Sequence, residues 1–248
     1  GWQIQRQEPT VQGALEKALA QVANHEARVT CCGRTDTGVH ALNQVAHFDS
    51  DSQRSERSWI LGLNSHLPNA ASVLWIREVD DDFHARFSAF ARTYRYRILN
   101  RWIRPALDNR RMSWCKALLD VEAMNQAAQA LQGEHDFTSF RATACQARHA
   151  VREIQAISVK REGDIVTLDV TANGFLYHMV RNIAGSLMHV GKGEAPVSWM
   201  KDTLEKMDRN AAAPTAQPEG LYFVGARYPA NYDLPGEAPA FPRGRGLS

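Results

Sequence analysis

A loop whose composition suits a reactive site lies near the start of the chain. It reads Gly33-Arg34-Thr35-Asp36-Thr37-Gly38-Val39-His40 and sets the carboxylate of Asp36 between a cation and two glycines. Glycine lets the backbone take a positive φ or approach a ligand closely, and a neighbouring guanidinium can hold a carboxylate ionised or bind a phosphate. Chemistry and nucleic-acid binding are therefore both open to this loop. Taken alone, however, the octapeptide favours a plain Asx turn, with Arg34 pointing to water.

Metal chemistry has little support in the sequence. His25, His40 and His47 lack a convincing ligand spacing. The cysteines include an adjacent pair but no C-x-x-C spacing, which fits neither a zinc site nor a disulfide framework. We therefore expect no metal site, and we expect reduced thiols at Cys31, Cys32, Cys115 and Cys145.

The elements around the loop follow from periodicity. Apolar residues recur at helical spacing after Thr10, a plausible N-cap, and they predict an amphipathic helix. Short β-prone segments at 28–32 and 44–48 flank the octapeptide. Asp36 is therefore predicted on a loop between two strands. A helix over 58–67, halted by Pro68, and a strand over 73–79 should follow.

The second half of the chain predicts strands packed against helices. Residues 93–99 alternate, with Tyr94 and Tyr96 on one face of the strand. On the residues alone, Tyr94 is more typical of a core tyrosine than of a catalytic one. A helix near 121–131, a hairpin of 154–160 with 165–171, and a helix over 177–190 complete the pattern. Helices beside mainly antiparallel strands indicate the α+β class.

Composition and charge set outer limits on function. The 248 residues are 44% hydrophobic and 23% charged, with a net charge of +2, which argues against disorder and is too small to imply nucleic-acid binding. The distribution is more informative, because nine Lys or Arg residues, one acid and six aromatics lie between His84 and Lys116. A polyanion could dock there, although solvated strand and loop faces would give the same pattern.

Localisation follows from what the sequence contains. No signal peptide opens the chain, and the apolar stretch 175–190 includes His178, Arg181 and His189, so it does not predict a membrane span. We expect a soluble cytoplasmic protein. The chain starts at Gly1 without a methionine, which suggests a fragment or an incomplete sequence.

The chain resembles the tRNA pseudouridine synthases of the TruA type. Gly-Arg-Thr-Asp-x-Gly-Val-His-Ala is the signature of that family and matches residues 33–41. Further matches occur in order along the chain: Gly1-Trp2-Gln3, residues 82–89, Arg95-Tyr96-Arg97, residues 135–140, residues 178–182 and residues 219–222. Matches spread over nearly the whole length favour the family over the plain turn.

The resemblance implies a fold, an activity and a substrate. The implied fold is a mixed, mainly antiparallel sheet in two α/β halves, flanked by helices, with a basic central cleft. The implied reaction isomerises uridine to pseudouridine at positions 38, 39 and 40 of the tRNA anticodon stem-loop, by a homodimer and without a cofactor. The reaction breaks the N-glycosidic bond, turns the base and rejoins it through carbon five.

The resemblance also assigns residues to roles. Asp36 matches the essential aspartate, as nucleophile or as base. Tyr94 matches a tyrosine that lies against the target base, and Arg181 matches a late basic residue that pairs with the aspartate. On periodicity alone, Arg181 could equally be a solvated helix arginine. A uridine inside a stem must leave the stack first, and we expect Arg34, Arg86, Phe87 and Arg92 to bind the RNA.

We expect an N-terminal catalytic half over residues 1–90 with its first strand apparently missing, a C-terminal half over 91–230, and a Pro- and Gly-rich tail over 231–248. Three alternatives remain open. The chain could be an RNA-binding relative without catalysis, a base-excising glycosylase, or a truncated and inactive fragment. The reaction product distinguishes the first two from a synthase.

Overall fold

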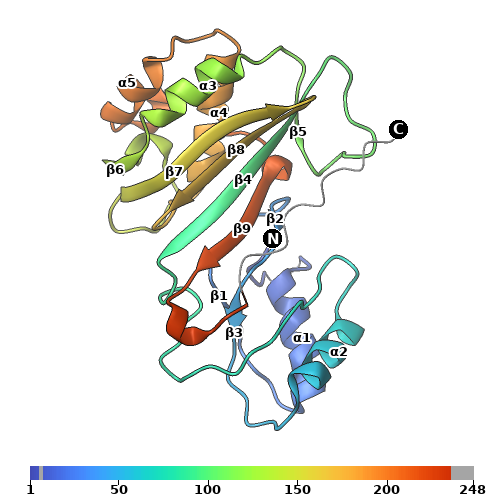
Figure 1. Ribbon diagram of the computed structural model, residues 1–248. Helices are drawn as coiled ribbons and strands as arrows, with labels where there is room; N and C mark the ends of the chain where they lie inside the picture. Colours follow the sequence, from blue (N-terminus) through green and yellow to red (C-terminus); the bar gives the residue numbers. More distant parts are fainter. Residues whose placement is uncertain (6–7, 236–248) are drawn as a thin grey trace. The chain divides into compact units, whose positions relative to one another are not determined.

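The computed structural model describes residues 1–5 and 8–235 and divides the chain into two compact units (Figure 1). Unit 1 comprises Gly1–Thr37, Ala41–Phe90 and Gly225–Ser248, and unit 2 comprises Gly38–His40 and Ala91–Val224. The predicted tail over 231–248 lies outside the described residues from residue 236 onward. Asp36 therefore belongs to unit 1, whereas Tyr94 and Arg181 belong to unit 2.

Unit 1 is built on two helices and a short pair of strands. Helix α1 (Val11–Ala23) begins where it was predicted, because the Thr10 hydroxyl accepts a hydrogen bond from the Gly13 N–H. Helix α2 (Glu56–His66) lies beside it (Figure 1) and is capped by Ser55. Strands β1 (Thr30–Cys31) and β3 (Ala46–His47) pair antiparallel. The core of this unit is formed by Trp2, Ala18, Leu19, Val22, Ala23, Val29, Cys31, Trp59 and Leu63.

The prediction of a strand over 73–79 is wrong. This segment belongs to no sheet, because a side chain takes the place of a partner strand. The Asn64 amide donates to the Val73 carbonyl at 2.8 Å, and the Val73 N–H donates to the Asn64 Oδ1 at 2.8 Å. Val73 and Ile76 still pack on the unit 1 core, so their apolar character reports burial rather than pairing.

Among the described residues, seven strands form one sheet in the order β2-β9-β4-β8-β7-β6, with β5 beside β4. The pairings of β4 with β8, β8 with β7 and β7 with β6 are antiparallel, whereas β5 runs parallel to β4. The strands are β2 (His40–Ala41), β4 (Ala91–Asn100), β5 (Ser113–Cys115), β6 (Gly133–Asp136), β7 (Val151–Glu162), β8 (Ile165–Ala172) and β9 (Leu221–Arg227). The predicted α+β class with a mainly antiparallel sheet is confirmed.

Helices cover one face of this sheet in unit 2. Figure 1 shows α3 (Val121–Gln129), α4 (Met179–Gly191) and α5 (Trp199–Glu205) on the same side of β4, β7 and β8. Alternate residues of β8 are buried, and the apolar side chains of α3 and α4 join them in one core. The register pairs Tyr94 with Val170 and Tyr96 with Leu168, two of the buried β8 positions. Single 3-10 turns occupy Thr138–Phe140, Arg209–Ala211, Pro218–Gly220 and Ala230–Tyr232.

Candidate active site

Asp36 lies where the sequence predicts it, on the loop that connects β1 to β2. Its side chain is half-buried, and the side chain of Arg34 is exposed. Gly38 has a φ of +84°, a conformation that glycine adopts without cost, and a Cβ there would lie 3.1 Å from the Pro218 Cγ. The second glycine of the motif is therefore required by the backbone.

A side chain holds the start of this loop in place. The Gln44 amide donates to the Gly33 carbonyl at 2.6 Å and accepts from the Gly33 N–H at 3.3 Å, so one side chain bonds both backbone polar groups of Gly33. The Cys32 N–H donates to the Val45 carbonyl at 2.8 Å, just before this clamp. The loop thus leaves the β1–β3 pair at a fixed point.

The first two residues of the chain hold the loop from another direction. The Trp2 N–H donates to the Thr35 carbonyl at 2.9 Å, and the Trp2 side chain is 5% exposed within the unit 1 core. A Cβ on Gly1 would lie 3.0 Å from the Thr35 carbonyl oxygen and 3.1 Å from the Thr37 nitrogen. The backbone on both sides of Asp36 is therefore pressed against residue 1.

The thiol of Cys31, at the base of the loop, is buried. Burial raises the pKa of the Cys31 thiol to about 12, and the nearby Cys32 adds to this increase. The guanidinium groups of Arg34 and Arg86 oppose it. Both cations therefore lie close enough to act on the Cys31 thiol electrostatically.

Tyr94 lies near the start of β4 in unit 2 and is half-buried. Its ring makes edge contacts with Phe175, at a centroid distance of 4.9 Å, and with Phe223, at 5.2 Å. These rings fix the plane of the phenol. Tyr94 is therefore an oriented aromatic at the end of a strand, which suits a stacking role and is equally compatible with a packed core residue.

Tyr96 belongs to the packed core of unit 2. Its side chain is fully buried, and its hydroxyl donates to the Gln217 carbonyl at 2.8 Å. Burial raises the pKa of this phenol well above its usual range, so it stays protonated at neutral pH. Tyr96 therefore connects β4 to the segment before Pro218.

Arg181 lies in the first turn of α4 and is half-buried. Its Nε donates to the Ala216 carbonyl at 2.8 Å, and the Ala216 N–H returns a bond to the Arg181 carbonyl at 3.1 Å. The charge of Arg181 opposes the increase that burial causes in the Tyr96 pKa, so the guanidinium lies close to β4. The fully solvated helix arginine is thus excluded, whereas pairing with Asp36 stays a prediction.

The basic stretch between His84 and Lys116 is divided between the two units. Arg86 belongs to unit 1, and the later cations belong to unit 2. Arg95 makes a bidentate pair with Asp169, at 2.6 and 3.0 Å, and Arg92 donates to the Asn173 carbonyl at 3.0 Å. Spacing along the sequence could not show that several of these charges bind within the fold.

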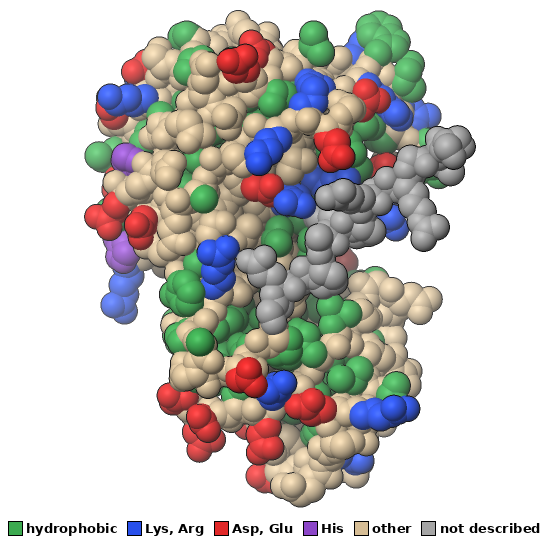
Figure 2. All heavy atoms as spheres, viewed as in Figure 1, with side chains coloured by type: hydrophobic (Ala, Val, Ile, Leu, Met, Phe, Trp, Pro, Cys, Tyr) green, Lys and Arg blue, Asp and Glu red, His purple; other side chains and the backbone are tan. Residues whose placement is uncertain are grey.

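The connection from β4 to β5 carries the exposed part of this stretch. Figure 2 shows hydrophobic and cationic side chains side by side over this connection. The Lys116 ammonium lies 3.9 Å from the centre of the Trp102 ring. Arg104, Arg110 and Trp114 line a cavity of about 300 Å³ within unit 2. The large exposed apolar side chains on this connection are Trp102, Ile103 and Leu107, and Trp114 on β5 and Leu118 just after it are also exposed.

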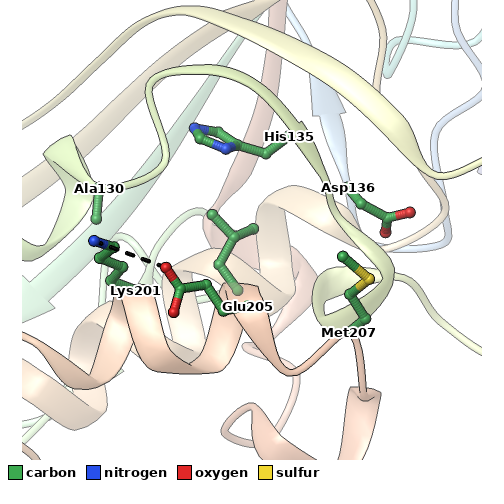
Figure 3. A pocket seen from close by; sticks show the side chains of 7 residues that line it. Ala130, His135, Asp136, Lys201, Glu205 and Met207 are labelled. Carbon is green, nitrogen blue, oxygen red and sulfur yellow. Dashed lines mark ion pairs between the residues drawn. The ribbon is translucent and has the colours of Figure 1, made fainter.

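A second cavity in unit 2, of about 140 Å³, contains none of the predicted site residues. Figure 3 shows it between β6 and α5, with His135 and Asp136 on one side and the Lys201–Glu205 ion pair on the other. The Asp136 carboxylate already accepts from the Thr138 N–H at 2.8 Å, and the His135 Nε2 contacts the Gln132 carbonyl. These polar groups serve the local fold.

All four cysteines are free thiols. Within residues 1–5 and 8–235, no group of three or more His, Cys, Asp or Glu side chains gathers as a metal site would require. None of the described helices is long and apolar enough to cross a membrane.

The sequence does not predict the residues that hold the Asp36 loop in place. It also does not predict the histidines that position the RNA-binding candidates. Gln44 was assigned only to a strand, and no feature of its neighbours signals a clamp. The sequence indicates no role for His47, because its spacing does not suit a metal ligand, whereas in the structure its Nδ1 accepts from the Ala85 N–H at 3.1 Å. His84 lies in a segment that matches the family, which was the one signal available for it.

Comparison with known proteins gives one consistent result. The sequence pattern of a family described as tRNA pseudouridine synthase matches residues 2–88 and 127–229. A protein of Stenotrophomonas maltophilia named tRNA pseudouridine synthase A is 52% identical over 238 residues, which covers 96% of this chain and 93% of the relative. Its namesake in Xanthomonas euvesicatoria is 53% identical over 239 residues, with the same coverage. A third, from Methylococcus capsulatus, is 52% identical and covered to 88%.

Proposed function

Because the chain belongs to the tRNA pseudouridine synthase family, whose members isomerise uridine to pseudouridine in tRNA, we propose the anticodon stem-loop as its substrate. The chain is an isomerase that acts on tRNA. The target uridines in this proposal are positions 38, 39 and 40. The support is the complete signature over residues 33–41 together with relatives named tRNA pseudouridine synthase A.

Asp36 is the proposed catalytic carboxylate, acting as nucleophile or as base. The observation that carries this role is the local geometry of its loop. Gln44, Trp2 and Gly1 all contact the backbone around a half-buried carboxylate, so the loop is restrained before substrate arrives. Restraint of this kind favours catalysis, because a reacting group that is already oriented loses little entropy in the transition state.

Tyr94 and Arg181 are the proposed partners of Asp36 from unit 2. Burying a carboxylate against a nucleobase would raise its pKa, and a nearby guanidinium opposes that increase and keeps the carboxylate charged. Tyr94 would stack on the uracil, and its phenol would support removal of the proton on carbon five. The half-burial of both side chains is compatible with these roles.

The remaining proposals concern binding and assembly. Arg34 would occupy the position that the flipped uridine leaves, and Arg86, Phe87 and Arg92 would contact the RNA. A homodimer in the cytoplasm is proposed as well. Its support is the exposed apolar group on the β4–β5 connection, since monomers rarely leave such a surface to water. Sedimentation of the purified chain tests the dimer directly.

The decisive experiment labels carbon five of the uracils in an anticodon stem-loop with tritium. The parent protein should release tritium and leave the strand intact. Asp36→Asn should release none while it still binds the RNA. Asp51→Asn provides a matched control, because Asp51 is an exposed carboxylate of the same unit. Abasic product would favour a glycosylase, and binding without release by the folded parent would leave an RNA-binding relative.

A further inference from the structure

An exposed aromatic side chain caps a rigid turn in unit 1. Phe87 is 74% exposed, and the guanidinium carbon of Arg86 lies 5.5 Å from the centre of its ring. An exposed phenylalanine gains nothing from burial in the free protein. The contacts beneath it therefore decide whether it is an incidental surface residue or a prepared platform.

Aromatic packing fixes the base of this turn. Phe83 is buried, and its ring lies 5.4 Å from the Tyr228 ring and 5.0 Å from the Tyr232 ring. The Tyr228 hydroxyl donates to the Ala85 carbonyl at 2.6 Å. The turn is thus anchored by residues that lie more than a hundred positions away in the sequence, which a simple surface loop would not need.

His84 holds the tip of the turn. Its Nδ1 accepts from the backbone N–H groups of Arg86, at 3.1 Å, and Phe87, at 3.2 Å. The backbone N–H of His84 donates to the Ser88 Oγ at 2.9 Å. The imidazole also lies under Phe87, with a centroid distance of 4.3 Å and an interplanar angle of 31°. One side chain thus fixes both the backbone and the ring of Phe87.

His47 connects this stack to the strand pair that carries the Asp36 loop. Its ring lies 4.7 Å from the His84 ring, and its Nδ1 accepts from the Ala85 N–H. In the β1–β3 pair, His47 lies opposite Thr30, one residue before Cys31. Because Arg86 and Arg34 both act on the Cys31 thiol, the stack and the catalytic loop share one neighbourhood of unit 1.

We propose that Phe87 is a stacking site for an unpaired nucleobase next to the target uridine, with Arg86 on the adjoining phosphate and His84 as the positioning residue. This inference rests on the proposed function, because it takes RNA as the ligand. Base stacking on an aromatic side chain accepts any base, and a neighbouring cation holds the backbone. The site would therefore hold the loop strand without reading its sequence.

The first test separates stacking from mere apolar contact. Phe87→Leu keeps apolar volume but loses the aromatic face, and Phe87→Trp keeps the face. We expect Phe87→Leu to raise the Kd for an anticodon stem-loop roughly 5- to 100-fold, and Phe87→Trp to leave it within about twofold of the parent. Phe90→Leu is the matched control, because Phe90 is a second exposed aromatic of unit 1, at 53%, outside this stack.

A scan of the RNA identifies the base. Anticodon stem-loops with one abasic position each are bound to the parent and to Phe87→Leu. At one loop position, removal of the base should weaken the parent's binding as much as the substitution does, and should cost Phe87→Leu nothing further. With 2-aminopurine at that position, fluorescence should be quenched by the parent and by Phe87→Trp, but not by Phe87→Leu.

The role of His84 has its own readout. His84→Asn keeps an acceptor for the two backbone N–H groups but removes the ring under Phe87, whereas His84→Ala removes both. We expect the Kd to rise from the parent through His84→Asn to His84→Ala. The rate of tritium release at saturating RNA should change far less than the Kd, because the substitution affects binding rather than chemistry.

Two results would overturn the proposal. In the first, the loss of affinity from Phe87→Leu adds to the loss from base removal at every position of the loop, which means that no base stacks on Phe87. The other is an unchanged Kd together with a changed sedimentation coefficient, which would make Phe87 a contact between protein chains. Failure of the proposed isomerisation is separate, because it appears in the tritium release of the parent and leaves the binding cycle measurable.

Discussion

The Asp36 loop of unit 1 and strand β4 of unit 2 are held in place by different kinds of contact. The loop extends from strands of two residues each and depends on Gln44 and on the first two residues of the chain. Strand β4 pairs with β8 continuously from Arg92 to Leu99 and packs on the larger of the two cores.

This difference predicts different responses to substitution. A loop that depends on a few individual contacts can move when one is removed, although the protein stays folded. A strand inside a long ladder keeps its position, because many contacts remain after one is lost. We therefore expect substitutions near the loop to reduce activity beyond their cost in stability. Substitutions of the fully buried residues of β4, such as Tyr96, should reduce stability alone.

The largest effect is expected for Trp2→Ala. The substitution removes a buried indole from the unit 1 core, and large-to-small changes of this kind cost about 3–5 kcal/mol in the free energy of unfolding. It also loosens the segment whose backbone bonds Thr35. The free energy of unfolding measured by urea denaturation and the rate of tritium release should both fall.

The matched substitution in unit 2 is Phe137→Ala, which removes a fully buried ring from the other core. Its cost in stability should be similar, but the protein that remains folded should keep its rate of tritium release. The comparison fails if the two variants lose equal activity per folded molecule.

Gly1→Ala should have the next largest effect and should act almost entirely on activity. The new methyl group would meet the Thr35 carbonyl and the Thr37 nitrogen, so the backbone beside Asp36 must shift. Misplacement by about 1 Å can cost on the order of 100-fold in rate, so we expect kcat to fall about 10- to 100-fold. Gly225→Ala is the control, because its Cβ would be 3.8 Å from the nearest atom.

Tyr96→Phe should have a smaller effect, and it should reduce stability rather than activity. It removes the hydrogen bond that the Gln217 carbonyl accepts at a part-buried position, at a cost of about 1 kcal/mol in the free energy of unfolding. Because the pairing of β4 with β8 is untouched, the rate of tritium release should stay within about twofold. A tenfold lower rate in the folded variant would show that β4 is no better restrained than the loop.

The sequence predicts the regular elements well because their signals are local. Helix α1 and its Thr10 cap, the β7–β8 hairpin and the end of α4 all follow from periodicity and from single residues. The parallel pairing of β5 with β4 and the strand β9 could not be predicted, because each depends on partners far away in the sequence.

The site was predictable only in part, for the same reason. The residue types of the Asp36 loop are visible in one octapeptide. The contacts that restrain the loop are not visible in it. The Gln44 side chain and Gly1 contact backbone atoms of the loop, and backbone atoms are the same for every residue type. The 73–79 segment shows the converse error, in which β-branched residues suggested a strand and the Asn64 amide took its place.

The smallest effect concerns His47 and the dependence of stability on pH. Burial lowers the pKa of His47 below its usual value of about 6.5, the nearby His84 lowers it further, and Asp49 acts in the opposite direction. The folded state therefore binds this proton less readily than the unfolded state does. The stabilisation is complete above the usual pKa and is lost as the pH falls through about 6.5 and below.

Protonation would also remove the acceptor at Nδ1 that receives the Ala85 N–H, so the turn that carries Phe87 should loosen over the same pH range. Urea denaturation between pH 8 and pH 5 should show the free energy of unfolding decreasing on the acid side. His47→Asn keeps an acceptor but cannot titrate, and it should flatten that slope, whereas His66→Asn, at an exposed histidine of α2, should not. An unchanged slope in His47→Asn would show that the turn is anchored by Phe83 and Tyr228 alone, and that unit 1 resembles unit 2 in spreading its restraints over many contacts.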